Sequence, residues 1–149
     1  DPITNGHIDV IHRASKIFDE VIVTLAINQT KKPLFSIDER MEMIKDAIKD
    51  YSNVSVSMFD GLLVDFAEKN NVKVIIRGLR AVSDFEYEFQ MALLTTKLSE
   101  GITTVYMMPH EKYTYLNSSI VREVAEFGGN VEKLVTPLVA QKLKKKFGP

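Results

Sequence analysis

The spacing of apolar residues changes several times along the chain, and each change predicts the end of one element and the start of another. Over residues 8–18 apolar side chains recur every three or four positions with charged residues between them, which predicts an amphipathic helix. The run at 20–27 is continuously apolar and rich in β-branched residues, a pattern typical of a strand that is covered on both faces. A loop at 28–35 follows, and Ser36 with Glu39 forms a capping box that predicts the start of the next helix.

The rest of the chain repeats this alternation of strands and helices. The elements predicted after residue 50 are a weaker strand at 54–58 near a sheet edge, a short helix at about 62–70, a strand at 72–76, a helix after a second capping box formed by Ser83 and Glu86, a strand at 103–108, a helix headed by Ser118 and Ser119 that ends at Gly128, and a last helix capped by Thr136 and Pro137. This order predicts an α/β fold in a single domain, residues 1–149, with a mainly parallel sheet and helices on both faces.

The chain opens on DPITNGH, which is shaped like the loop that leads from a strand into a helix. Asp-Pro and Asn-Gly are turn dipeptides, and the helical spacing begins directly after Gly6 and His7. In parallel sheets such loops lie at the carboxyl ends of the strands, where ligands bind. We therefore expect a short strand before Asp1, which would be the first strand of the sheet.

Composition narrows the classes of function. The chain has 149 residues, 45% of them apolar and 26% charged, and its net charge of −1 and pI near 6.4 argue against a nucleic-acid protein with a large basic surface. It has no cysteine, so disulfides, zinc–thiolate sites and thiol nucleophiles are excluded. No apolar run approaches the roughly 18 residues of a membrane span. We expect a cytoplasmic protein that binds neither nucleic acid nor membranes.

Four clusters of polar residues follow strands, where ligand loops are expected. They supply fixed cations, hydroxyl donors and the backbone amides of helix starts, which suit a phosphorylated ligand. The clusters are Thr4 with His7, Lys31 with Lys32, Arg77 with Arg80, and Ser118 with Ser119. The chain lacks both phosphate-loop motifs, G-x-x-x-x-G-K-[ST] and G-x-G-x-x-G, which disfavours a P-loop ATPase or a dinucleotide dehydrogenase. No acidic cluster has metal-ligand spacing, so any metal is expected to arrive with the nucleotide.

Most of these clusters also have a purely structural interpretation. His7 is equally typical of a solvent-exposed or capping residue, and Lys31 with Lys32 is more typical of a solvated pair. Ser118 and Ser119 are expected to cap a helix in any case, and they bind phosphate only if that helix points at the site.

Arg77 and Arg80 carry a stronger signal. They flank a glycine directly after a buried strand, which favours a phosphate ligand, although ion pairs with acidic residues at 84, 86 and 88 are the structural alternative. Apolar and aromatic residues near these loops are weighed in the same way. The core face of a helix is favoured over an apolar ligand channel for Leu62, Leu63, Met91 and Leu94. A surface position is favoured for His12 and His110. Tyr113 and Tyr115 could either stack on a base or pack on a helix, and both interpretations stay open.

Four segments together resemble the bacterial phosphopantetheine adenylyltransferases. They are DPITNGHIDVIHRA, KKPLFSIDER, IIRGLRAVSDFEYEFQ and SSIVREVA, in this order and spacing, and the resemblance spans essentially the whole chain. The family belongs to the nucleotidyltransferases with a T/H-x-G-H motif and a later I-S-S-T-x-x-R-like motif. The resemblance implies a Rossmann-like fold and transfer of the adenylyl group of ATP to 4'-phosphopantetheine, which gives dephospho-coenzyme A and pyrophosphate. It also implies Mg2+ bound with ATP, a homohexamer, and coenzyme A as a feedback ligand.

The resemblance assigns roles to residues of this chain by position. The implied catalytic positions are His7, Lys31 and Arg80. The implied phosphopantetheine-binding positions are Lys31, Leu63 and Arg77. The implied ATP-binding positions are Thr4, His7, Gly78, Leu79, Arg80, Glu88, Tyr113, Thr114, Tyr115, Leu116, Asn117, Ser118 and Ser119. No residue is assigned to a metal.

The chain departs from the family pattern at three places. Family members have Gly-Ser/Thr-Phe directly before the equivalent of Asp1, at the end of the first strand, and the chain begins after that segment. Asn117 stands where most members have serine, and Thr95 stands where asparagine is common. Because asparagine still donates and accepts hydrogen bonds, activity is not excluded.

Two other functions stay open on the sequence alone. One is a sister nucleotidyltransferase whose acceptor is nicotinate mononucleotide or glycerol phosphate, against which Arg77 and the Leu63 region match the pantetheine enzyme specifically. The other is a module that senses ATP or coenzyme A without turnover.

Overall fold

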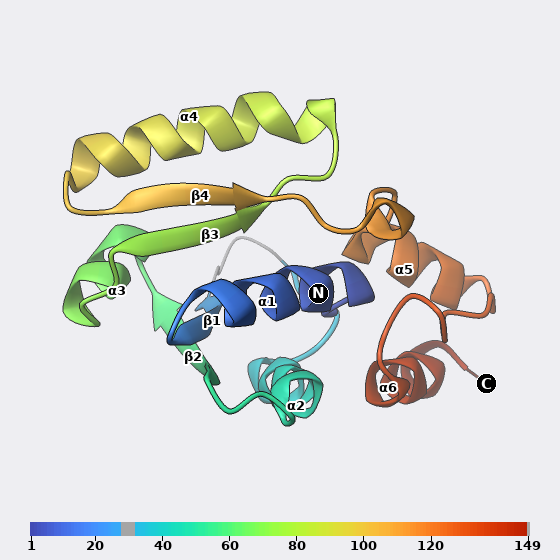
Figure 1. Ribbon diagram of the computed structural model, residues 1–149. Coiled ribbons are helices and arrows are strands. Elements are labelled where there is room, and N and C mark those ends of the chain that lie inside the picture. Colours follow the sequence, from blue (N-terminus) through green and yellow to red (C-terminus); the bar gives the residue numbers. More distant parts are fainter. Residues whose placement is uncertain (28–31, 149) are drawn as a thin grey trace.

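The computed structural model describes residues 1–27 and 32–148 (Figure 1). Its elements follow the predicted alternation of strands and helices, with one short 3-10 helix in addition. They are α1 (Asn5–Ile17), β1 (Val21–Ile27), α2 (Ile37–Ile48), β2 (Val54–Asp60), α3 (Leu63–Lys69), β3 (Val74–Gly78), α4 (Val82–Leu98), β4 (Thr103–Met107), η1 (Glu111–Tyr113), α5 (Ser118–Glu126) and α6 (Pro137–Phe147).

The strands form two parallel pairs. β1 pairs with β2 along its whole length, with Val21 opposite Val54. β3 pairs with β4 in the same way, with Val74 opposite Thr103. In the described part of the chain each strand has one partner, so β2 lies at an edge as expected but so do the other three strands, and the single sheet that was predicted is present as two separate pairs. The parallel direction that the crossover helices predict is also confirmed.

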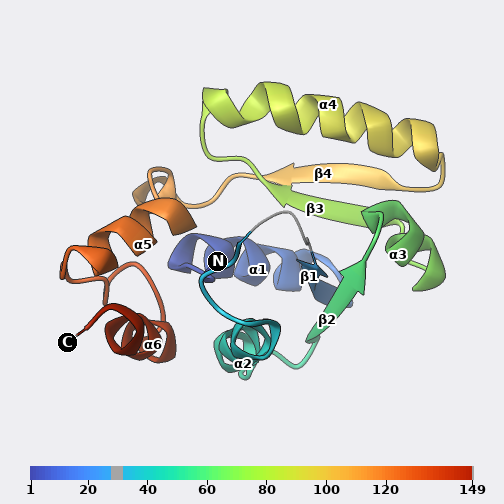
Figure 2. The ribbon, with the colours of Figure 1, turned by 180° about the vertical axis from the view of Figure 1, so that it is seen from behind.

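Helices lie on both sides of the strands (Figures 1 and 2). α1 lies in front of β1 in Figure 1 and contacts both β1 and β3, whereas α2 packs on β2 and α4 packs on β4. α5 and α6 pack against each other, and α6 also contacts α2. The arrangement confirms the Rossmann-like α/β fold, and it brings the N-terminal loop close to the C-terminal helices.

Local capping signals located the starts of two helices, α2 and α6. Ser36 and Glu39 form the predicted capping box at α2, Thr136 caps α6, and Gly128 follows α5 with a φ of 74°, a backbone conformation that favours glycine. The capping box at Ser83 and Glu86 is wrong. α4 begins two residues earlier than that box requires, so its N-cap is Ala81, which has no side-chain oxygen to offer.

Three groups of buried apolar side chains form the core. The first joins α5 and α6 to α2 and the loop before it, the second lies between α1, β1 and α2, and the third lies between α3 and β3. The first group consists of Phe35, Met43, Leu116, Val121, Val131, Val135, Val139 and Leu143. The predicted inner face of α1 is confirmed at Ile11 and Ala14, but Ile17 at the end of that helix is 68% exposed.

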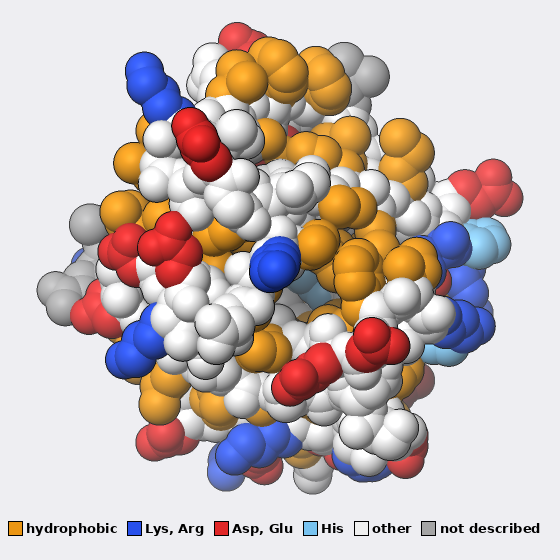
Figure 3. Space-filling model, turned by 60° about the vertical axis from the view of Figure 1, so that its left-hand side comes forward, with side chains coloured by type: hydrophobic (Ala, Val, Ile, Leu, Met, Phe, Trp, Pro, Cys, Tyr) orange, Lys and Arg blue, Asp and Glu red, His pale blue; other side chains and the backbone are white. Residues whose placement is uncertain are grey.

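α4 departs from the expectation that its apolar residues belong to the core. One side of the helix rests on β4, while the other side stays uncovered in the described part of the chain. Figure 3 shows hydrophobic side chains gathered at the top of the molecule, where α4 lies. The exposed large side chains of α4 are Phe85, Tyr87, Phe89, Met91, Leu93, Leu94 and Leu98. Leu62 is exposed as well, whereas Leu63 packs against the third core group.

No helix in the described ranges combines the length and the apolar character that crossing a bilayer requires.

Candidate active site

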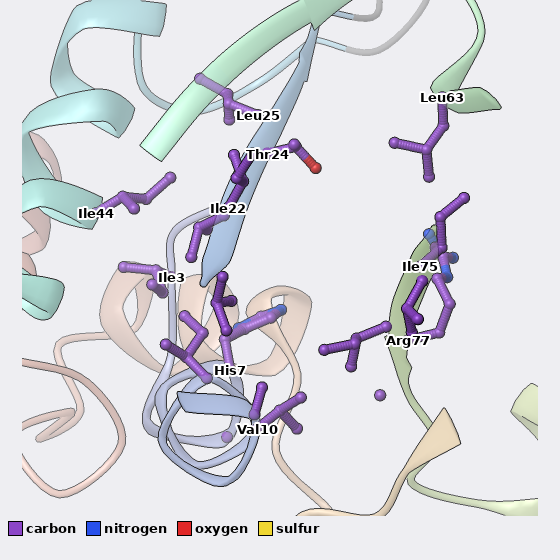
Figure 4. Close-up of a pocket in the computed structure, with 18 of the residues that line it drawn as sticks. Ile3, His7, Val10, Ile22, Thr24, Leu25, Ile44, Leu63, Ile75 and Arg77 are labelled. Atoms are coloured by element: carbon purple, nitrogen blue, oxygen red, sulfur yellow. The ribbon is translucent and has the colours of Figure 1, made fainter. Parts of the chain in front are cut away.

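A cavity of about 1020 Å³ lies between the two strand pairs. Residues 21–25 of β1 and residues 72–78 at β3 all line it. Because successive side chains of a strand point to opposite faces, a cavity that touches every residue in turn runs along the edge of the strand. In the described ranges no strand pairs with the facing edges of β1 and β3, which therefore form its two walls, and the strand expected before Asp1 would pair with these edges. Figure 4 shows Thr24 on one wall, Ile75 and Arg77 on the other, and His7 below the space between them.

The histidine at the start of α1 is held by a capping box. The backbone N–H of Thr4 donates to Nδ1 of His7 at 3.1 Å, and the Thr4 hydroxyl lies 2.8 Å from the same nitrogen and accepts from the His7 backbone N–H at 3.5 Å. The capping interpretation of His7 is confirmed, and the ring also lines the cavity. Because Nδ1 accepts a backbone hydrogen bond, the neutral ring carries its proton on Nε2. His7 is therefore a hydrogen-bond donor through Nε2.

Although His7 is exposed, the protein around its ring favours the uncharged form. Desolvation by the surrounding protein lowers the pKa of His7 to about 4, and the positive charge of Arg80 contributes in the same direction. The ring is still open to solvent on the side of the cavity. At neutral pH it is a neutral donor that a ligand can reach.

Arg77, at the end of β3, forms an ion pair with Glu88 of α4. Its Nε donates to Oε2 at 2.9 Å and its Nη2 donates to Oε1 at 2.7 Å. These hydrogen bonds are the main cause that raises the pKa of Arg77. The ion pair that was the structural alternative to phosphate binding is therefore present at Arg77. The pair does not bury the arginine, because 40% of the Arg77 side chain stays exposed.

Arg80 is held in a similar way by Asp84. Its Nε and Nη2 donate to the two carboxylate oxygens at 3.2 and 3.3 Å. Its Nη1 donates to the backbone carbonyl of Leu116 at 3.0 Å, so the arginine bridges from α4 to the loop before α5.

The start of α5 lies at the same cavity. Its N-cap is Asn117, whose Oδ1 accepts from the backbone N–H of Ile120 at 2.9 Å. The expectation that Ser118 and Ser119 cap this helix is wrong, because the Ser118 hydroxyl donates instead to the carbonyl of Pro2 at 2.7 Å and Ser119 is exposed. Asparagine caps helices as well as serine does, so the departure at position 117 keeps the helix start intact.

Comparison with known proteins identifies the relatives of this chain. Residues 1–124 match the cytidylyltransferase-like family. The chain is 57% identical over 148 residues to the phosphopantetheine adenylyltransferase of Dictyoglomus thermophilum, which covers 99% of the chain and 90% of that protein. It is 52% identical over 147 residues to the phosphopantetheine adenylyltransferase of Caldanaerobacter subterraneus subsp. tengcongensis, covering 99% of the chain and 92% of that protein. The chain belongs to the phosphopantetheine adenylyltransferase family. The resemblance inferred from the four sequence segments is confirmed.

Most of the residues to which the family resemblance assigns a role line the cavity. Those that line it are Thr4, His7, Leu63, Arg77, Gly78, Arg80, Glu88, Leu116, Asn117 and Ser118. Those that do not line it are Leu79, Tyr113, Thr114, Tyr115 and Ser119. Lys31 lies outside the described residues. Tyr113 packs against the first core group, and Tyr115 is 60% exposed.

A further cation at the cavity was not predicted. Arg40, in the second turn of α2, lines the cavity and is half-buried. Desolvation lowers the pKa of its guanidinium, and in the described part of the chain no carboxylate offsets that effect. Its only sequence signal is a place one turn into a helix, which does not distinguish it from a solvated arginine.

Asp9 was also missed, although it ties two parts of the site together. Its carboxylate accepts from the backbone N–H of His110 at 2.8 Å, a contact across 101 residues, and forms an ion pair with Arg13 at 2.8 Å. The helix that carries His7 is thereby fixed to the loop after β4. The surface positions predicted for His12 and His110 are confirmed.

An NMR titration of the ligand-free protein tests the protonation state of His7. We expect its ring to titrate near 4 instead of 6.5. Because the unfolded chain binds this proton at higher pH than the folded chain does, His7 lowers the free energy of unfolding as the pH falls from 6.5 toward 4. The variant His7→Gln should lose that part of the pH dependence. A ring that titrates near 6.5 would contradict the geometry described here.

Proposed function

We propose that the protein transfers the adenylyl group of ATP to 4'-phosphopantetheine, giving dephospho-coenzyme A and pyrophosphate, a step of coenzyme A biosynthesis. The observation that carries this proposal is that one cavity collects a neutral imidazole donor, three arginines and a helix start from separate parts of the chain. The family membership supports the same reaction, because the two relatives described above are named phosphopantetheine adenylyltransferases.

The acceptor needs no base in this reaction. It is a phosphate monoester with a second pKa of about 6, so it is already largely dianionic at neutral pH. The difficulty is to bring this dianion against a triphosphate and to stabilise the charge that gathers on the α-phosphate as pyrophosphate leaves. Fixed cations and neutral donors meet that requirement by positioning and electrostatics, without a covalent intermediate.

We assign the roles as follows. Lys31 and Arg77 hold the nucleophilic phosphate, and Leu63 lies beside the pantetheine arm. His7 donates its Nε2–H to the α-phosphate oxygen in the in-line transition state. Arg80 and the start of α5 hold the β and γ phosphates, together with the remaining positions that the family assigns to ATP.

A divalent metal is expected with the nucleotide, as is general for nucleotidyltransferases that act on ATP, and we propose that it is Mg2+. In the described ranges no three His, Cys, Asp or Glu side chains group in a way that holds a metal ion, and Glu88 at the cavity is engaged by Arg77. This donor set fits an ion that is carried by the triphosphate. When bound, the ion would neutralise phosphate charge.

We further propose a homohexamer, and coenzyme A as a feedback ligand of the same cavity. The exposed apolar side chains of α4 support self-association, because large exposed apolar patches are typical of interaction surfaces. Light scattering coupled to size-exclusion chromatography tests the number of subunits. A cytoplasmic location stays a prediction.

The decisive experiment is mass-spectrometric detection of dephospho-coenzyme A. Purified protein is incubated with ATP, Mg2+ and 4'-phosphopantetheine, with nicotinate mononucleotide and glycerol phosphate as alternative acceptors. We expect adenylyl transfer to phosphopantetheine alone. Product from another acceptor would assign a sister activity, and ATP binding without product from any acceptor would favour a sensing module.

A further inference from the structure

One carboxylate joins the helix that carries His7 to the loop that precedes α5. Asp9 lies in the second turn of α1, and its Oδ2 accepts from the backbone N–H of His110 at 2.8 Å. Among the hydrogen bonds of the described ranges, this is the only one between α1 and residues 109–117. The register of the helix against the loop therefore depends on a single acceptor.

This acceptor is charged and held in place. Oδ2 of Asp9 also accepts from Nε of Arg13 at 2.8 Å, and the Asp9 side chain is 17% exposed. Desolvation raises the pKa of Asp9, but the hydrogen bonds from Arg13 and from the His110 backbone, with the charge of Arg13, outweigh it and lower that pKa. Asp9 is therefore ionised at neutral pH, and hydrogen bonds to a charged acceptor are stronger than those to a neutral one.

The loop that donates to Asp9 is a connected turn that reaches the cavity. The carbonyl of His110 accepts from the backbone N–H of Tyr113 at 2.8 Å, and the carbonyl of Tyr113 accepts from the N–H of Leu116 at 3.0 Å. Leu116 lines the cavity, and its own carbonyl accepts from Nη1 of Arg80 at 3.0 Å. A chain of hydrogen bonds thus leads from α1 through this turn to Arg80.

The first turn of α1 also lies against this loop. A Cβ at Gly6 would lie 3.6 Å from Cβ of Tyr113 and 3.9 Å from Cδ2 of Leu116. Contacts of this kind hold two segments together, but they have little directional preference. The hydrogen bond of Asp9 is directional, so it fixes where along α1 the loop lies.

We propose that Asp9 is a positioning residue, which sets the separation between His7 on α1 and Arg80 with the start of α5. This inference rests on the proposed function, in which His7 meets the α-phosphate of ATP while Arg80 and the start of α5 hold the β and γ phosphates. A triphosphate that contacts both groups binds more tightly when their separation is already fixed, because less ordering is required on binding. Asp9 does not line the cavity, so it acts on ATP without touching it.

Steady-state kinetics and calorimetry of two variants test this role. We expect Asp9→Ala to raise the KM and the Kd for ATP about tenfold, within the range of couplings between contacting residues. The KM for phosphopantetheine should stay within about twofold, because Arg77 and Leu63 lie on other elements. The matched control is Arg13→Ala, which removes the ion pair but leaves the carboxylate to accept from His110. We expect this control to stay within about twofold for both substrates.

Removing the donor tests the same hydrogen bond from its other side. His110→Pro deletes the backbone N–H, and the φ of −54° at this position is one that proline adopts. We expect it to raise the Kd for ATP as much as Asp9→Ala does, whereas His110→Ala, which loses the same ring but keeps the N–H, should stay within about twofold. In the His110→Pro background Asp9→Ala should add nothing.

Three results would overturn the inference. They are a full further rise in the Kd for ATP when Asp9→Ala is added to His110→Pro, an effect of Arg13→Ala as large as that of Asp9→Ala, and a parallel rise of the KM values for both substrates. If Asp9→Ala does not fold, as judged by circular dichroism, the comparison of His110→Pro with His110→Ala decides.

The Kd for ATP distinguishes failure of this inference from failure of the proposed function. Absence of dephospho-coenzyme A from the unmodified protein would overturn the proposed reaction, and the positioning role would then be judged by the calorimetric Kd values alone. An unchanged Kd for ATP in a folded Asp9→Ala protein would overturn the positioning role and leave the reaction standing.

Discussion

Replacing His7 with alanine should lower turnover about a hundredfold while ATP still binds. The loss of one fixed donor to the charge that develops in a transition state typically costs about 3 kcal/mol, which corresponds to that factor in rate. The capping box fixes the ring, and Nδ1 accepts from Thr4, so the Nε2–H is the only polar hydrogen of the neutral ring left for a ligand. Measurements of kcat by pyrophosphate release and of ATP affinity by calorimetry check the two parts of the prediction.

The control for this variant is His12→Ala on the same helix. His12 is exposed, and its ring contacts Tyr51 outside the cavity. We expect its kcat to stay within about twofold of the unmodified protein, as is usual for surface substitutions that change the free energy by less than about 0.5 kcal/mol. Unchanged turnover in His7→Ala would remove the imidazole from the mechanism. Loss of ATP binding would make it a nucleotide-binding residue instead.

Replacing Phe35 with alanine should lower the free energy of unfolding by about 3–5 kcal/mol. Phe35 is 1% exposed and belongs to the first core group, so the truncation leaves a cavity among side chains of three helices. Its backbone N–H donates to the Asp1 carboxylate at 2.9 Å, and this hydrogen bond survives in the variant. The measured loss therefore reports the side chain alone. Urea unfolding followed by circular dichroism gives the value.

Phe127→Ala is the matched control, since the same group is removed from a side chain that is 83% exposed. We expect the free energy of unfolding to change by less than about 0.5 kcal/mol. Similar losses in both variants would mean that the first core group does not stabilise the fold as described.

The sequence predicted the elements because most of the signals that mark them are local. The capping box of α2, the apolar run of β1 and the Thr136–Pro137 helix start each depend on neighbours within a few residues. The start of α4 was misplaced because the point at which the chain leaves β3 is set by tertiary packing, and a Ser-x-x-Glu spacing does not report it. The apolar residues of α4 were expected in the core since spacing alone does not reveal whether anything covers a helix.

The site was predictable in its residue types but not in its contacts. Loops that follow strands indicated His7, Arg77 and Arg80, and the structure brings all three to one cavity. The partners of both arginines were left open among three nearby acids, because the choice depends on the register of α4 against β4. Asp9 carried no signal, since its partner lies 101 residues away.

The contacts that complete the site join opposite ends of the polypeptide. The Ser118 hydroxyl meets the carbonyl of Pro2 across 116 residues, and the backbone N–H of Asn5 donates to the carbonyl of Leu134. The chain between these residues must close into a long loop before such contacts can form, and that closure costs conformational entropy. During synthesis the N-terminal segment therefore leaves the ribosome long before its partners exist. Competence to bind a ligand is therefore gained only after the last third of the chain has emerged and folded back.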